Sequence, residues 1–250
     1  MRFAYATRAS KGARHYQEDS SAVLEDAGRL TVVLADGMGG HAGGALASNL
    51  ACKFFLHAFA TSKGPVPDRL TESLELANAA IAQETMGNPG LSGMGCTLIG
   101  AAFGPEGVEW VSVGDSPLFL VRAGEIVVLN EDHSLAPEID KLAAKGKITW
   151  EAAKADHRRH FLRSALTGTD IELVDRSQRP LALQAGDVVI LASDGIHTIS
   201  HSQIARLVAA ANTPEAAAES LLAAVAAVGD TAQDNTTVAA VQVTSGQPPP

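Results

Sequence analysis

The stretch Leu30–Gly40, LTVVLADGMGG, decides how the rest of this chain is organised. Its residues 31–34 are β-branched or apolar and form a run of strand length. The run stops at Asp36-Gly37, where a glycine-rich turn begins. Because a strand carries its last residue to the edge of a sheet, the sequence predicts that the Asp36 carboxylate lies at one end of the fold.

The preceding residues predict a partner for this strand. Residues 21–25 have strand composition, and residues 26–29, Asp-Ala-Gly-Arg, are typical of a four-residue hairpin loop. We expect Glu25 to pair with Leu30, and the antiparallel register then places Asp19 opposite Asp36. Facing carboxylates repel each other unless a shared proton or a cation offsets the repulsion. An isolated Asp-Gly is also a common turn dipeptide, so the cation site needs further acids to support it.

Three later segments supply those acids. The stretch DVVILASDG ends a second buried-type strand at Asp194, and the segment 110–116 ends its strand at Asp115. Asp234 stands directly before a Thr- and Val-rich strand over residues 236–243. An acid at the start of one strand meets acids at the ends of its antiparallel neighbours. The sequence therefore predicts one acidic cluster built from four distant segments.

Composition limits the kinds of protein that this chain can be. With 250 residues, 46% of them hydrophobic, the chain is expected to form one domain over residues 1–243, with a loose tail over residues 244–250. A net charge of -9 argues against binding to nucleic acids or acidic membranes, because both are polyanions. Cys52 and Cys96 are too few for a disulfide framework. Since no segment resembles a signal peptide or a membrane span, we expect a cytoplasmic protein.

The periodicity predicts many antiparallel strands, with two helices early in the chain and two late. We expect an α+β fold, a four-layer α-β-β-α sandwich of two antiparallel sheets with helices on both outer faces. The helix over residues 45–59 should place Leu46, Leu50, Phe54 and either His57 or Ala58 on one face. Residues 97–103, 108–113 and 118–121 should form a meander, and residues 171–174 a further strand.

Two basic features lie near the expected acids. Arg14 stands five residues before Asp19, so its guanidinium could grip a phosphate or carboxylate, or could form a surface ion pair with Glu18 or Asp19. The segment ending in Arg158-Arg159-His160 carries most of the local positive charge. It would suit an anionic substrate, although a solvated helix face is the commoner explanation.

Seven ordered blocks closely resemble the bacterial form of the type-2C, metal-dependent Ser/Thr protein phosphatases, the PPM family. The resemblance covers about residues 3–243, and seven blocks in this order are far more specific than a single Asp-Gly. The blocks are Arg14…Glu18-Asp19, Asp36-Gly37-Met38-Gly39-Gly40-His41, Gly95-Cys96-Thr97, Gly114-Asp115-Ser116, Asp132-His133-Ser134, Ser193-Asp194-Gly195 and Asp234-Asn235-Thr236-Thr237.

The resemblance implies a centre of two Mn²⁺ or Mg²⁺ ions at one end of the two sheets. Asp36 would bridge both ions, and the Gly37 carbonyl would bind one of them. The remaining implied roles are Asp19, Asp194 and Asp234 on the other ion, Asp115 on a possible third ion, and Glu18 behind the ligands. Such an all-oxygen set suits hard divalent ions and disfavours zinc.

The implied reaction is the hydrolysis of phosphoserine and phosphothreonine in proteins. Two cations about 3.5 to 4 Å apart lower the pKa of a bridging water, so that hydroxide is available for in-line attack on phosphorus. Arg14 would neutralise the phosphoryl oxygens. Animal members are thought to protonate the leaving group with a histidine at the position of Met38. His41 is the candidate stand-in here, and metal-bound water or solvent are the alternatives.

The sequence departs from the family pattern at three places: Pro117 stands where Arg is usual, Gln17 where Asn is frequent and Cys96 where Thr is common. Pro117 alters the contacts beside the loop that carries Asp115. The segment of about residues 136–163 aligns with the family's flap, which borders the substrate groove.

We therefore expect a monomeric phosphoprotein phosphatase that opposes a Ser/Thr kinase. A catalytically inactive binding module is one alternative, but no core aspartate is missing. A hydrolase of small phosphate monoesters is the other, because the same chemistry acts on any monoester that fits.

Overall fold

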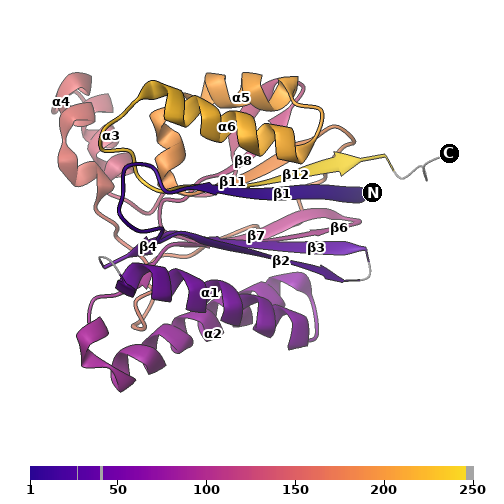
Figure 1. Ribbon diagram of the computed structural model, residues 1–250, viewed down its shortest axis with the longest axis horizontal. Helices are drawn as coiled ribbons and strands as arrows, with labels where there is room; N and C mark the ends of the chain where they lie inside the picture. The colour runs from indigo at the N-terminus through magenta and orange to yellow at the C-terminus, as the bar shows by residue number, and fades with distance from the viewer. Residues whose placement is uncertain (27, 40–41, 246–250) are drawn as a thin grey trace.

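Two β-sheets pack face to face and a layer of helices covers each outer face, as Figure 1 shows. The computed structural model describes residues 1–26, 28–39 and 42–245. The expected four-layer α+β sandwich of two antiparallel sheets is confirmed.

Each sheet contains five strands, and all neighbouring strands are antiparallel. The first sheet has the order β10 (Asp175–Arg176), β7 (Gly107–Val113), β6 (Leu98–Gly104), β3 (Arg29–Ala35) and β2 (Ser20–Asp26). The second has the order β1 (Arg2–Ser10), β12 (Thr236–Thr244), β11 (Val188–Ala192), β8 (Leu118–Arg122) and β9 (Glu125–Val128). A short pair, β4 (Gly37–Met38) with β5 (Gly95–Cys96), lies at the end of the first sheet. Residues 246–250, the end of the expected tail, lie outside the described residues.

Helices α1 (Ala42–Thr61) and α2 (Val66–Gly87) cover the first sheet, and α5 (His201–Ala210) and α6 (Pro214–Val228) cover the second (Figure 1). Helices α3 (Ala136–Ala144) and α4 (Trp150–Ala155) form a small lobe with its own apolar cluster of Ile139, Ala143 and Ala153. Three 3-10 helices complete the described elements: Pro89–Leu91, His157–His160 and Asp194–Thr198. Within the described ranges, we find no helix whose length and apolar character would let it cross a bilayer.

The register between β2 and β3 is the predicted one. Glu25 pairs with Leu30 and Ser20 pairs with Ala35, so the next residues along the two strands are Asp19 and Asp36. The hairpin is tighter than the expected four-residue loop, because Asp26 and Arg29 themselves pair. Ala27 of that loop falls outside the described residues.

The expected meander is wrong, because the chain changes sheets after β7. β6 and β7 pair in the first sheet, whereas β8 pairs with β11 in the second. Leu118 and Leu120 face the core between the sheets, while Phe119 and Val121 pack under α5 and α6. A strand buried on both faces carries no alternation that reveals its sheet. The strand expected over residues 171–174 is also absent. The strand in this region is the two-residue β10, which begins at residue 175.

The buried face of α1 differs from the predicted one. Ala47, Ala51 and Phe55 are fully buried, whereas Phe54 is only half-buried. A Cβ atom added to Gly100 of β6 would collide with the Phe55 ring, so the glycine leaves the space that this ring fills. Two alanines and a glycine therefore let the helix approach the sheet closely, which a pattern of large apolar residues does not indicate.

We expect Phe55→Ala to destabilise the protein by about 3 to 5 kcal/mol, because it removes a buried ring and leaves a cavity. The matched control Phe54→Ala, one position along α1, should cost less than about 1.5 kcal/mol. Urea unfolding with an unchanged m-value measures both effects. Equal losses for the two variants would contradict the assigned helix face.

Candidate metal centre

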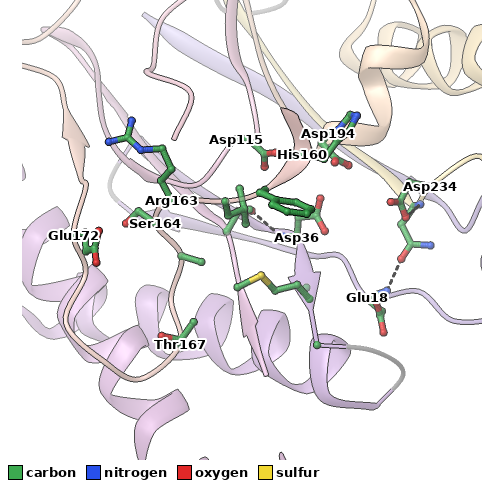
Figure 2. Close-up of a pocket in the computed structure, with 18 of the residues that line it drawn as sticks. Glu18, Asp36, Asp115, His160, Arg163, Ser164, Thr167, Glu172, Asp194 and Asp234 are labelled. Atoms are coloured by element: carbon green, nitrogen blue, oxygen red, sulfur yellow. Dashed lines mark hydrogen bonds between the residues drawn. The ribbon is translucent and has the colours of Figure 1, made fainter. Parts of the chain in front are cut away.

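Four aspartates from four segments surround one cavity at the end of the sandwich, and Figure 2 shows Asp36, Asp115, Asp194 and Asp234 around it. The cavity has a volume of about 770 Å³. Asp36 follows β3 and Asp115 follows β7, while Asp194 follows β11 and Asp234 precedes β12. The antiparallel order of the strands brings these residues to the same edge, because the ends of some strands lie beside the starts of others.

Asp19 lies behind this group and is 8% exposed. Its Oδ2 atom accepts a hydrogen bond of 2.7 Å from the Ser193 hydroxyl. Its Oδ1 atom is buried and has no hydrogen-bond partner in the described part of the chain. A buried carboxylate oxygen without a donor is costly, so a proton, a water molecule or a cation is needed to satisfy it.

Burial and mutual repulsion shift the pKa values of these acids. Burial raises the pKa of Asp36 well above its usual range, and the charges of Asp19 and Asp194 raise it further. The pKa of Asp194 rises to about 6, through burial first and then through Asp234 and Asp19. Burial and the Asp194 charge raise the pKa of Asp115 to about 7. The acids therefore form one electrostatic group that needs protons or cations to offset its charge.

The donor set fits divalent cations that prefer oxygen. Its members are carboxylates, with Gly37 and Glu18 also lining the cavity. In the described ranges, no three His, Cys, Asp or Glu side chains close into a preformed cage around one point. Two of the carboxylates have partners within the protein, since Arg14 is ion-paired with Asp234 and the Ser193 hydroxyl donates to Asp19. A cation bound by Asp234 would compete with Arg14 for that carboxylate.

Arg14 stands at the mouth of the cavity with its guanidinium 2.5 Å from the Asp234 carboxylate. This partner is neither of the two acids considered from the sequence, Glu18 and Asp19. Both side chains of the ion pair are exposed by more than a third, so solvent weakens the attraction. The guanidinium can therefore exchange Asp234 for an anionic ligand at little cost.

Asn235 holds the loop that carries Arg14, a role that the sequence analysis missed. Its side-chain amide donates to the backbone carbonyls of Lys11 (2.8 Å) and Tyr16 (3.0 Å). Its Oδ1 atom accepts from the backbone N–H of Glu18 at 2.7 Å. Asn235 is 4% exposed, so all three bonds are shielded from water. The sequence feature that could have indicated this role is a polar residue directly before an apolar strand, where its side chain becomes buried.

The small lobe contributes the opposite wall of the cavity. His160, Phe161 and Arg163 line it, and Figure 2 shows His160 beside Asp194. The guanidinium of Arg163 also forms a 2.9 Å ion pair with Glu138. The expected histidine, His41, lies outside the described residues. His160 was assigned from sequence only to a basic segment, because residues 158–160 are distant in the chain from every aspartate of the site.

Comparisons with known proteins give the site a family context. Residues 9–241 match the family model described as "Protein phosphatase 2C". The chain is 34% identical over 195 residues to "Serine/threonine protein phosphatase PstP" of Mycobacterium tuberculosis, a match that covers 77% of this chain and 36% of that protein. It is 32% identical over 189 residues to "Serine/threonine phosphatase stp" of Listeria innocua, with 73% of each protein covered.

A solved structure resembles nearly the whole chain. It is titled as the catalytic domain of serine threonine protein phosphatase PstP in complex with 2 manganese ions, and it superposes with a TM-score of 0.79 at 32% identity. The match covers 97% of this chain and 99% of that one. The chain spans about a third of the length of the first curated relatives that it matches, 36%.

We expect the metal-free protein to lose stability as the pH rises from about 4 to about 7. The pKa values of Asp36, Asp194 and Asp115 are raised on folding, so the folded state binds protons that the unfolded chain has released in this range. The loss should be about 2 kcal/mol or more. Chemical unfolding in EDTA at several pH values measures it, and Mn²⁺ should restore stability most at the upper end.

The double variant Asp36→Asn/Asp194→Asn is the control for this pH dependence. His133 and His197, whose pKa values are lowered mainly by desolvation, are present in both proteins, so their contribution cancels in the comparison. The variant should have a clearly smaller slope, and the part that Asp115 carries through its own burial should remain. An unchanged slope would show that these carboxylates do not carry the effect.

We expect Asn235→Ala to lower the free energy of local opening of residues 11–18 by about 1 to 3 kcal/mol, because two carbonyls and one N–H lose a buried partner. Amide hydrogen exchange of this loop measures the change. Ser200→Ala, which removes the N-cap of the distant helix α5, is the control for a general loss of stability. Equal exchange in the loop of the two variants would contradict the role given to Asn235.

Proposed function

Because the chain belongs to the protein phosphatase 2C family, we propose that it hydrolyses phosphoserine and phosphothreonine in proteins with the help of divalent cations. One observation carries the proposal: Asp36, Asp115 and Asp194, all with raised pKa values, converge from separate strands at one cavity, and Asp19, whose pKa is also raised, lies next to them. Relatives named as Ser/Thr phosphatases and a similar structure with two manganese ions support it.

We assign two Mn²⁺ or Mg²⁺ ions to this centre, held by Asp36, the Gly37 carbonyl, Asp19, Asp194 and Asp234. A third ion would use Asp115. When bound, such ions lower the pKa of water, which makes hydroxide available near neutral pH. The unpartnered Oδ1 atom of Asp19 supports its assignment as a ligand. Glu18 lines the cavity and would orient the ligands from behind.

The protein's own groups would bind and orient the phosphoryl group. Arg14 would leave Asp234 and donate two parallel hydrogen bonds to the phosphoryl oxygens. Arg14 would be released before the substrate binds, because cations would bind the Asp234 carboxylate first. Asn235 would keep the loop, and with it the guanidinium, at the mouth of the cavity.

The leaving alkoxide requires a proton, for which His41 is the residue indicated by the sequence. His160 is a second source, because it lines the cavity next to Asp194. The lobe over residues 136–163, which carries His160, would act as the flap that borders the substrate.

The size of the cavity favours a polypeptide substrate over a small phosphate monoester. A volume of about 770 Å³ far exceeds the space that a phosphate group needs, and the cavity is open to solvent. An inactive binding module is disfavoured by the retention of all the aspartates named above. We also propose that the protein works as a monomer in the cytoplasm, opposite a Ser/Thr kinase. Its free, buried cysteines suit a reducing compartment.

The purified protein with Mn²⁺ should release phosphate from a phosphothreonine peptide, and EDTA should abolish the release. Asp36→Asn and Asp194→Asn should each lower kcat at least about 10³-fold, which is about 4 kcal/mol of transition-state stabilisation. Asp68→Asn, in the first turn of α2, is the control and should leave the rate unchanged. Turnover of only a small aryl phosphate would favour the monoester hydrolase, and no turnover at all would favour the binding module.

A further inference from the structure

A second cavity of about 490 Å³ lies directly beside the catalytic one. Helix α2 forms one side of it with Leu74, Glu75, Asn78, Ala79 and Ala82. The other side is the segment 168–176 that follows the flap. Thr169 and Asp170 line both cavities, so a single loop separates them and the two spaces adjoin.

The loop between the cavities is fastened at its tip. The Asn78 side chain donates to the carbonyl of Thr169 (2.7 Å) and accepts from the N–H of Gly168 (2.9 Å). Gly168 has a positive φ of 80° and lies so close to α2 that a Cβ atom there would stand 2.6 Å from the Cα atom of Ala82. Only glycine permits this approach without strain, so the loop sits on the helix in a fixed position.

The base of the same loop is closed by Ser164. Its hydroxyl donates to the Leu173 carbonyl (2.9 Å) and accepts from the Leu173 N–H (3.0 Å). Leu166 within the loop is fully buried. Figure 2 shows Ser164, Thr167 and Glu172 along the side of the catalytic cavity away from Asp194 and Asp234. The loop is therefore a preformed wall, which reduces the entropy cost of binding along it.

The second cavity combines apolar surface with uncompensated charge. Leu74, Ile171 and Val174 supply the apolar part. Glu75 and Asp170 are exposed, and neither has a hydrogen bond or ion pair in the described part of the chain. Arg176 at one side is the opposing cation. The charge balance favours a ligand that carries basic groups on an apolar framework.

We propose that this second cavity binds the substrate chain next to the phosphorylated residue and selects basic residues there. The inference rests on the proposed phosphatase function. A polypeptide whose phosphoryl group lies at the aspartates can continue past Thr169 and Asp170 into the second cavity, because the two spaces adjoin at these residues. Lysine or arginine side chains would pair with Glu75 and Asp170, and their methylene stems would cover the apolar wall.

The test compares three substrates of the Mn²⁺-loaded protein. They are para-nitrophenyl phosphate, a phosphothreonine peptide with three basic residues on each side, and the same peptide with glutamates in their place. The wild-type protein should show a KM for the basic peptide at least about tenfold below that for the acidic one, equivalent to about 1.4 kcal/mol. The aryl phosphate reaches only the catalytic cavity and reports its integrity.

Ala79→Trp fills the second cavity from an exposed position on α2. It should raise KM for the basic peptide about tenfold and leave kcat/KM for the aryl phosphate unchanged. Gln83→Trp, one helical turn along α2 and outside both cavities, is the matched control and should change neither. Glu75→Lys should abolish the preference for the basic peptide without affecting the aryl phosphate.

Two results would overturn the inference, and they differ from failure of the proposed function. The first is an unchanged peptide KM in Ala79→Trp, and the second is a wild-type protein that handles both peptides equally well. If the wild-type protein hydrolyses the aryl phosphate but neither peptide, the proposed protein phosphatase function itself is wrong and the inference falls with it.

Discussion

Repulsion between buried carboxylates is the constraint on which the rest of this structure depends. The charges of Asp19 and Asp194 raise the pKa of Asp36, and Asp234 and Asp19 raise that of Asp194, at a place where burial already penalises ionisation. A fold keeps such an arrangement only if a proton or a cation completes it. The protein therefore gives up stability at one end of the sandwich to hold a site that is complete only when positive charge enters.

The packing of the two sheets offsets the repulsion between the carboxylates of this site. The strands β3, β6, β8 and β11 are largely apolar, and the core between the sheets and the cores under the helices fix where these strands end. Side chains that bond to backbone then fix the loops beyond the strands: Asn235 holds the Arg14 loop, and Ser193 links Asp19 to β12. Arg14 is the exception, since its exposed ion pair is weak enough to exchange. Rigid carboxylates and one adaptable cation suit the proposed binding of metal ions and of a phosphoryl group.

The segment after the flap forms one wall of the cavity that contains this site. It turns the catalytic cavity into one of two adjoining spaces, because Asn78 and Ser164 pin a single loop between them. The proposed hydrolytic chemistry would belong to the strand ends, whereas recognition of a chain around the phosphorylated residue would belong to α2, this loop and the flap. These elements lie on the surface and can change without disturbing the aspartates.

The sequence by itself determined the strand that ends at Asp36, its register with β2 and the identity of the acids, since each depends on local pattern or turn chemistry. Only the tertiary structure decided the sheet to which β8 belongs, the face that α1 buries, the partner of Arg14 and the presence of His160 in the cavity. Leu118–Val121 is apolar on both faces, and the close packing of α1 depends on Gly100, 45 residues beyond Phe55. Contacts of this kind join residues far apart in the chain, so no local pattern can encode them.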